Sequence, residues 1–250
     1  MRPPHVVITM AGMGSRFRAA GYQVPKYRVL ARGRPLFDWS IESLSSFIAA
    51  GSAFTFILQR ADAAADFVVE RARALGVADV RIVEIDGLTD GQATTALLAE
   101  PTIADRAAPI VIYNIDTYVD PADLPAAAVR GEGWIPCFAA QGDAWSFVAL
   151  GADGRAVEVR EKRRISPHAT VGLYYFSSFD LYARLYRDLY DAAGETPEAG
   201  ERYVAPMYNA LIGQGGAVYI HPVPLESVVP LGTPAEVAAF DPAASPTQVT

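Results

Sequence analysis

Cysteine, histidine and lysine are scarce in this sequence. Its 250 residues include one cysteine, Cys137, and three histidines, so the chain can form no internal disulfide and no structural zinc site of the usual Cys/His kind. No run of 18 apolar residues occurs, and the first residues lack the pattern of a cleavable signal. We therefore expect a cytoplasmic protein that does not span a membrane.

The sequence also lacks an excess of positive charge. Its 21 basic and 28 acidic residues give a net charge of −7, without the basic surface that sequence-independent binding of nucleic acid requires. We therefore expect no nucleic-acid partner. Nineteen of the basic residues are arginine, and Lys26 and Lys162 are the two lysines. Because a compact ammonium and a planar guanidinium are not interchangeable, the two lysines are candidates for a specific role.

Strand and helix patterns alternate in the first half of the chain. Short β-branched runs read as buried strands, and apolar residues three and four apart between them indicate amphipathic helices. The predicted strands are His5–Met10, Ala53–Leu58, Asp79–Ile85 and Pro109–Asn114, and the predicted helices cover residues 35–49, 61–75 and 90–100. Such alternation predicts a mostly parallel sheet with helices on both faces and with ligands at the carboxyl ends of the strands.

The second half begins with strand patterns that follow one another without helices, which predicts antiparallel strands. The predicted elements are strands at Trp134–Ala139, Phe147–Leu150, Ala156–Val159 and Val171–Phe176, helices at Ser178–Ala192 and Tyr203–Ile212, a strand at Ala217–Val223 and a short helix after Pro234. No linker separates two domains. We expect one α/β domain with a mixed sheet over residues 1–240 and a flexible tail over residues 241–250.

A glycine-rich segment directly follows the first predicted strand. In Met10–Phe17, Gly12 and Gly14 allow backbone amides to approach an anion closely, because no Cβ stands in the way. Phe17 stands where a dinucleotide fingerprint has its third glycine, and the Gly-Lys-Ser/Thr ending of a P-loop is missing. The segment therefore predicts a different phosphate-binding loop, with Arg16 and the downstream Lys26 as its cations.

Further motifs follow in a recognisable order. They are Pro25-Lys26-Tyr27-Arg28-Val29-Leu30, Gly33-Arg34-Pro35-Leu36, Gly91-Gln92-Ala93-Thr94-Thr95-Ala96-Leu97, Asn114-Ile115-Asp116, Glu161-Lys162, Thr170–Phe176, Gly200-Glu201-Arg202-Tyr203 and Leu231-Gly232-Thr233-Pro234. In these motifs the chain resembles, from about Val6 to Phe240, the nucleotidyltransferases that join a nucleoside triphosphate to a sugar 1-phosphate or a similar small phosphorylated acceptor. The resemblance implies a Rossmann-like (GT-A-like) fold, with a nucleotide-binding half (1–120) and an acceptor-binding half (121–240).

The resemblance also implies a reaction and its residues. The acceptor oxygen attacks the α-phosphorus, pyrophosphate leaves, and Mg²⁺ assists. The short branch that the chain resembles is linked to capsule precursors and to cytidylylation of phosphate or phosphonate compounds, which favours CMP transfer. The implied catalytic residues are Arg16, Lys26, Asp116 and Lys162. The implied nucleotide-binding residues are Ala11, Gly12, Met13, Gly14, Ser15, Thr89, Gly91, Gln92 and Thr94. The implied acceptor-binding residues are Asn114, Trp145, Glu161, Gly172, Glu201 and Tyr203.

One departure from the family bears on the metal. Pro230 occupies the position where the family commonly has a second aspartate, so Asp116 and the nearby Glu226 are the expected Mg²⁺ ligands. Two other functions remain open. Asn114-Ile115-Asp116 is close to the Asp-x-Asp motif of glycosyltransferases that use nucleotide sugars, and Pro230 is compatible with a catalytically silent nucleotide-binding module. A homo-oligomer is also open, because the sequence does not specify the oligomeric state.

Overall fold

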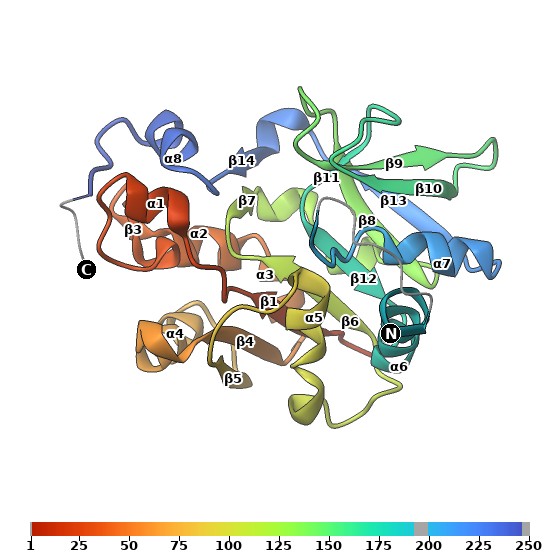
Figure 1. The fold of residues 1–250 in the computed structure, drawn as a ribbon, viewed down its shortest axis with the longest axis horizontal. Helices are drawn as coiled ribbons and strands as arrows, with labels where there is room; N and C mark the ends of the chain where they lie inside the picture. Colours follow the sequence, from red (N-terminus) through yellow and green to blue (C-terminus); the bar gives the residue numbers. More distant parts are fainter. Residues whose placement is uncertain (1, 193–199, 247–250) are drawn as a thin grey trace.

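The computed structural model of the chain describes residues 2–192 and 200–246 (Figure 1). Its strands are β1 (His5–Thr9), β2 (Leu30–Ala31), β3 (Arg34–Pro35), β4 (Phe54–Gln59), β5 (Val80–Ile85), β6 (Ile110–Asn114), β7 (Thr117–Val119), β8 (Gly133–Phe138), β9 (Ser146–Leu150), β10 (Ala156–Glu161), β11 (Ala169–Thr170), β12 (Leu173–Phe176), β13 (Val218–Pro222) and β14 (Val228–Pro230). Its α-helices are α1 (Ser15–Ala19), α2 (Leu36–Glu42), α3 (Ser45–Ala49), α4 (Ala65–Ala74), α5 (Gln92–Leu97), α6 (Phe179–Tyr186), α7 (Met207–Gly213) and α8 (Pro234–Phe240).

A ten-stranded mixed sheet organises the fold. Its order is β10-β9-β11-β8-β12-β6-β1-β4-β5, with β13 paired to β8. Strands β5, β4, β1 and β6 are parallel, as predicted, and β12, β8, β11, β9 and β10 pair antiparallel. β13 is an exception in the second half, because it runs parallel to β8. The predicted α/β fold with a mixed sheet is therefore confirmed.

Helices cover both faces of this sheet, because the side chains of β1 alternate between two hydrophobic cores. Val6 and Ile8 join the core under α2, α3 and α4, and Val7 joins the core under α5, α6 and α7. None of the helices in the described ranges is both long and apolar enough to span a bilayer.

A third, smaller cluster joins the two ends of the chain. Phe17 of α1 and Leu36 of α2 pack with Leu231 and Val237, which brings α8 beside α1 and β3 (Figure 1). The sequence predicts a flexible tail from residue 241 on. Within it, Asp241 accepts a hydrogen bond from the Arg32 amide at 2.6 Å, and Ala244 packs against this cluster. Residues 247–250 lie outside the described residues.

Several predicted helices are shorter than the sequence patterns suggest. The helix predicted over residues 35–49 is interrupted at Ser43 and Leu44, where the Ser43 hydroxyl accepts a hydrogen bond from the Val119 amide. The helix predicted from Tyr203 begins at Met207, directly after Pro206. A proline fits the first turn of a helix but not its interior, so Pro206 favours the later start. The short antiparallel pair of β7 and β14 was not predicted.

Candidate active site

The glycine loop leaves the carboxyl end of β1 and enters α1. Gly14 adopts a left-handed conformation (φ 59°) at the start of this helix, which a residue with a side chain would adopt only at a cost. Gly12, Met13 and Ser15 are exposed. Arg16 is also exposed, and its guanidinium contacts no polar group among the described residues. The loop therefore presents backbone amides and an unpaired cation to solvent.

Lys26 brings the second cation to this loop. A Cβ built on Gly14 would lie 3.9 Å from the Cβ of Lys26, so the loop and the lysine are neighbours. The Lys26 ammonium lies 2.6 Å from Oδ2 of Asp116, which lies two residues beyond the end of β6. Both side chains are about four-fifths buried, with 18% and 24% of their surface exposed. The predicted glycine loop, lysine and aspartate therefore meet at one place.

A second carboxylate lies close to Asp116. The Leu231 amide donates to the backbone carbonyl of Asp116 at 2.8 Å, which places Gly232 over the aspartate. A Cβ at position 232 would lie 3.2 Å from Asp116 Oδ2 and 3.6 Å from Glu236 Oε2, so the two carboxylates border the same small space. The Glu236 carboxylate makes no hydrogen bond or ion pair within residues 2–192 and 200–246.

The structure places Glu226, the other predicted metal ligand, elsewhere. Pro230 pairs with Thr117, the residue after Asp116, and the β14–β7 ladder then runs away from the aspartate to Val228 and Val119. Glu226 precedes this strand, at the far end of the ladder, and is exposed. Its position along the strand therefore separates it from Asp116.

The turn over residues 89–95, which carries predicted nucleotide-binding residues and resembles the family's base-reading turn, is held by its own threonines. Thr89 and Thr95 each donate a hydrogen bond to the Gly91 carbonyl at 3.0 Å. Gln92, the first residue of α5, donates to the Thr9 hydroxyl of β1 at 3.1 Å. Thr94 contacts the Tyr186 hydroxyl at 2.8 Å. The turn is thereby fixed to the carboxyl end of β1.

The predicted acceptor-binding residues form a second polar group. Lys162 directly follows β10 and is one of three non-glycine residues with a positive φ (50°) in the described part of the chain. Its ammonium donates to the Tyr203 hydroxyl at 2.6 Å. That hydrogen bond, with smaller contributions from Glu161 and Glu201, raises the pKa of Lys162, so the ammonium stays charged at neutral pH. A strained backbone that holds a charged side chain is common at functional sites.

Glu161 and Trp145 flank this lysine. The Glu161 carboxylate accepts a hydrogen bond from Ser146, whose hydroxyl also lies 3.3 Å from that of the buried Tyr174. The Trp145 ring packs edge-on against Phe138, and its backbone carbonyl accepts from the Lys162 amide at 2.9 Å. Trp145 is therefore tied to the lysine through the backbone, while its ring contacts the core.

Asn114 and Gly172 lie against each other. A Cβ at Gly172, which has a positive φ of 81°, would lie 2.6 Å from the amide atoms of Asn114. Oδ1 of Asn114 is buried and accepts no hydrogen bond within the described ranges. Asn114 pairs in register with Thr9, the residue that Gln92 contacts. This strand end therefore links the base-reading turn to the position of Asp116.

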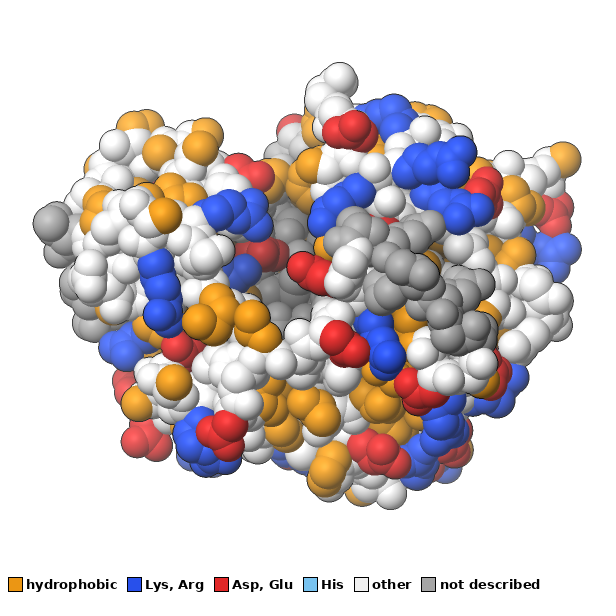
Figure 2. Space-filling model, in the orientation of Figure 1, with side chains coloured by type: hydrophobic (Ala, Val, Ile, Leu, Met, Phe, Trp, Pro, Cys, Tyr) orange, Lys and Arg blue, Asp and Glu red, His pale blue; other side chains and the backbone are white. Residues whose placement is uncertain are grey.

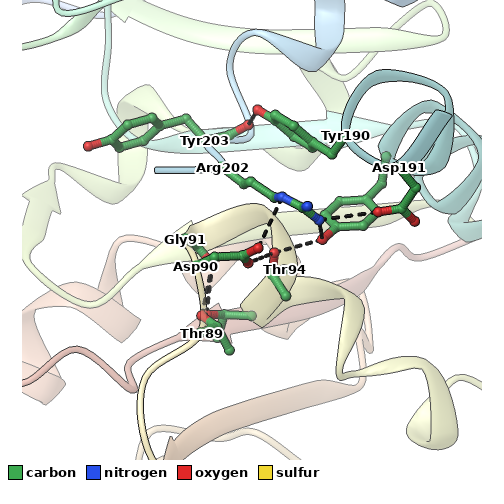
Figure 3. A network of polar contacts seen from close by, with 10 residues as sticks. Thr89, Asp90, Gly91, Thr94, Tyr190, Asp191, Arg202 and Tyr203 are labelled. Carbon is green, nitrogen blue, oxygen red and sulfur yellow. Dashed lines mark hydrogen bonds and ion pairs between the residues drawn. The ribbon is translucent and has the colours of Figure 1, made fainter. Parts of the chain in front are cut away.

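Arg202 contacts both the base-reading turn and the segment that contains Tyr190 and Asp191, as Figure 3 shows. Its guanidinium lies 3.0 Å from Asp90 and 3.2 Å from Asp191, and it donates to the Tyr186 hydroxyl at 2.6 Å. Its chain neighbour Tyr203 receives the Lys162 hydrogen bond. The sequence motif that contains Arg202 was recognised, but no role was predicted for the arginine.

Gln59 and Glu236 were missed as well. Gln59, buried at the end of β4, donates to the carbonyls of Ala11 and Gly87 at 2.7 and 2.9 Å and so joins the glycine loop to the loop before the base-reading turn. The sequence signal that could have identified Gln59 is a glutamine at the end of a buried strand. For Glu236, the signal is the Thr233-x-x-Glu236 spacing, which also predicts a helix start.

The surface of the molecule has a hollow on one face. Figure 2 shows the face of the molecule indented between the part built from α1, α2 and α8 and the part built from β8 to β13, with basic and acidic side chains along the walls. Lys26 and Asp116 touch directly, whereas Lys162 is linked to residues 90–93 through Tyr203 and Arg202.

Comparison with known proteins identifies the family. No family model matches the chain, and no curated protein matches it. Among solved structures, the nucleoside-diphosphate-sugar pyrophosphorylase from Vibrio cholerae RC9 is 34% identical with a TM-score of 0.85, over 94% of this chain and 98% of that one. The inositol-1-phosphate CTP transferase from T. maritima has the same fold at 16% identity, with a TM-score of 0.72 over 98% and 99% of the two chains. The chain therefore belongs to the nucleotidyltransferase superfamily, whose members join the nucleotidyl group of a nucleoside triphosphate to a phosphorylated acceptor and release pyrophosphate.

Proposed function

We propose that this enzyme transfers CMP from CTP to a sugar 1-phosphate or another small phosphate or phosphonate acceptor. The observation that carries the proposal is the contact of Lys26 with Asp116 beside the glycine loop. The choice of CTP rests on the capsule- and phosphonate-linked branch that the sequence resembles. It also agrees with the CTP that the similar T. maritima transferase uses. Both substrates are phosphorylated metabolites, so we also propose a cytoplasmic enzyme.

The proposed mechanism needs no protein nucleophile. The acceptor phosphate oxygen is already ionised at neutral pH, so the protein positions the reactants and neutralises charge. Arg16 and the amides from Gly12 to Ser15 hold the leaving β,γ-phosphates. Lys26 releases Asp116 and moves to the α-phosphate, where negative charge builds up. Lys162 receives the phosphate of the acceptor.

The residues of the site fit a magnesium ion. Mg²⁺ prefers carboxylate oxygens and substrate phosphates as ligands, and it keeps several waters. The space next to Gly232, which a Cβ would fill, is bordered by Asp116 and by the unpaired carboxylate of Glu236. We propose that Asp116 and Glu236 hold the ion, with Glu226 as the alternative second ligand. Bound Mg²⁺ supplies positive charge to the triphosphate.

The test is an exchange screen. Labelled pyrophosphate is incubated with the enzyme, Mg²⁺, each of the four common triphosphates and a panel of phosphorylated acceptors. We expect label to enter CTP in the presence of a matching acceptor, and pyrophosphate to be released in the forward direction. Release of a free nucleoside diphosphate from a nucleotide sugar would favour a glycosyltransferase. Tight triphosphate binding without turnover on any acceptor would favour a silent nucleotide-binding module.

Substitution of the two contacting residues tests the mechanism itself. We expect Lys26→Ala and Asp116→Ala each to slow pyrophosphate release by roughly 10²–10³, the usual cost of losing one preorganised charged contact. Arg73→Ala, which removes an exposed cation on α4, serves as the control and should leave the rate unchanged. Near-normal turnover in either site variant, with the fold confirmed by circular dichroism, would contradict the mechanism.

A further inference from the structure

The backbone of Arg202 is paired with the base-reading turn on both sides. Its amide donates to the Asp90 carbonyl at 2.8 Å, and its carbonyl accepts from the Ala93 amide at 2.9 Å. Gly91 lies against this peptide so closely that a Cβ would be 2.4 Å from the Arg202 oxygen. The segment around Arg202 thus runs beside residues 90–93 like a short added strand, and the two segments cannot shift independently without breaking both hydrogen bonds.

The Arg202 side chain fixes the same turn from a second direction. Its guanidinium is one-quarter exposed and bonds at the same time to Asp90, Asp191 and Tyr186 (Figure 3). These partners belong to the base-reading turn and to α6 with the π-helical turn η6 (Arg187–Ala192) that follows it. The rigid, planar fork of an arginine suits such simultaneous contacts, which a lysine could not make together.

The next residue belongs to the acceptor side. The Tyr203 hydroxyl accepts the hydrogen bond from Lys162, and its carbonyl accepts one from the Tyr190 hydroxyl at 2.7 Å. Two consecutive residues therefore contact the two substrate-binding groups, since Arg202 contacts the turn and Tyr203 contacts the acceptor lysine. A displacement of either group acts on the other through a single peptide unit.

Resting on the function proposed above, we propose that Arg202 is a positioning residue that couples the nucleotide-binding turn to the acceptor-binding Lys162. A nucleotide that orders the turn also orders Tyr203 and Lys162. The acceptor then binds to a site that has already lost its conformational entropy, so less entropy is lost when the acceptor binds. Coupling between two binding events is reciprocal, and the acceptor must therefore tighten nucleotide binding by the same factor. Neither Arg202 nor Tyr203 needs to touch the nucleotide for this effect.

A double-mutant cycle measures this coupling. The dissociation constant of Mg-CTP is determined by calorimetry for the full-length wild type, Tyr203→Phe, Arg202→Ala and the double variant, with UTP, ATP and GTP in parallel. Tyr203→Phe removes only the hydroxyl that Lys162 contacts. We expect it to weaken nucleotide binding about three- to tenfold when Arg202 is present and less than about twofold when Arg202 is absent.

Arg202→Lys replaces Arg202→Ala in the cycle if the alanine variant folds poorly. It keeps the positive charge beside Asp90, so we expect near-normal thermal stability while the effect of Tyr203→Phe on nucleotide affinity is still lost. Arg106→Ala is the matched control, because Arg106 also forms two ion pairs between separate elements, with Glu100 and Asp180, away from the site. It should leave the dissociation constant unchanged.

The outcomes separate this inference from the function on which it rests. If the wild type binds none of the four triphosphates, the proposed function fails, and the coupling fails with it. If the wild type binds a triphosphate and Tyr203→Phe weakens binding equally with and without Arg202, or not at all, the function stands and the coupling is overturned. A lower melting temperature of Arg202→Ala with an unchanged dissociation constant would also overturn it, because that pattern indicates a purely structural arginine.

Discussion

At the scale of single residues, both lysines occupy places where a compact cation contacts one oxygen. Lys26 contacts a single carboxylate oxygen of Asp116, and Lys162 contacts the single hydroxyl of Tyr203. Arg202 differs, because its guanidinium bonds to Asp90, Asp191 and Tyr186 at once. This division follows the chemistry of the two side chains, a point charge against a planar fork.

A second residue-scale feature is the pair of glutamates that we propose as alternative second ligands of the metal. We expect Glu236→Gln to weaken Mn²⁺ binding, followed by electron paramagnetic resonance, by about tenfold or more, since changes at ordered metal sites commonly cost that much. The reason is that Glu236 borders the space next to Asp116, whereas Glu226 lies at the far end of the β14–β7 ladder.

Glu226→Gln provides the matched control for this measurement, with the same chemical change on an exposed glutamate. It should leave Mn²⁺ affinity as in the wild type. The reverse result, with Glu226→Gln weakening binding and Glu236→Gln leaving it unchanged, would assign the second ligand to Glu226 and contradict our proposal.

The sequence identified site residues unevenly, and the reason is physical. Gly14, Lys26 and Asp116 belong to compact motifs whose residue types suggest phosphate and metal chemistry. The structure places them in contact. Arg202, Gln59 and Glu236 are ordinary polar residues, and their importance depends on partners from distant parts of the chain. Spacing along the chain cannot reveal such partners, so only the folded arrangement shows that Gln59 joins two loops.

At the scale of elements, the base-reading turn depends on a glycine. We expect Gly91→Ala to lower the free energy of unfolding by roughly 2–4 kcal/mol, because its φ of 148° disfavours a side chain and the new Cβ would clash with the Arg202 backbone. Gly87→Ala is the control, since Gly87 also has a positive φ (93°) but open space around it.

The free energies of unfolding of both glycine variants, measured in urea, separate the effect of the clash from that of the backbone conformation. The Gly87 variant should carry only the conformational penalty, of about 1–2 kcal/mol. Equal losses for the two variants would show that the close contact between the turn and Arg202 is unimportant for stability.

A buried histidine in β1 should make stability depend on pH. Burial lowers the pKa of His5 from its usual 6.5 to about 4, with Arg81 adding to the effect, and its ring bonds to Thr55 of β4 at 2.7 Å. Between these values the unfolded chain binds a proton that the folded chain does not, so unfolding becomes easier as pH falls from about 6.5 to about 4. We expect His5 to contribute roughly 3 kcal/mol to this loss.

The measurement compares wild type with His5→Gln by urea unfolding at pH 7.5, 5.5 and 4.5. Carboxylates titrate in both proteins, so the difference between the two curves reports His5. The wild type should lose more stability than the variant as the pH falls. Parallel curves would mean that His5 is protonated as easily in the folded protein as in the unfolded chain.

Elements that follow from the residue pattern of their own segment were predicted better than elements that depend on contacts with distant segments. The β-branched and apolar runs of β1, β4, β5 and β6 suffice to specify strands, and these were predicted close to their observed bounds. The pair of β7 and β14 forms between residues over one hundred positions apart and has no local signal. The break between α2 and α3 likewise depends on the Val119 amide, which bonds to Ser43 across the fold.

At the scale of the whole molecule, the C-terminal helix completes a site that begins at the N-terminus. Val237 of α8 is fully buried against the cluster that contains Phe17 of α1, the helix that follows the glycine loop. The neighbouring Glu236 faces the space next to Asp116. Packing of α8 therefore positions the proposed metal ligand and supports the glycine loop at the same time, so the proposed function links stability to catalysis at this contact.

Two buried valines separate the contributions of stability and position. Val237→Ala should lower the free energy of unfolding by roughly 1–3 kcal/mol, as loss of buried methyl groups does. It should also reduce pyrophosphate release several-fold at saturating triphosphate, because α8 carries Glu236.

Val77→Ala removes the same methyl groups from the core under α4, away from the site, and should cost similar stability while the rate stays near that of the wild type. The ring of Trp39, which packs against Phe240 of α8, reports the loosened helix through its fluorescence. Equal loss of activity in both variants would show that activity follows general stability rather than the placement of α8.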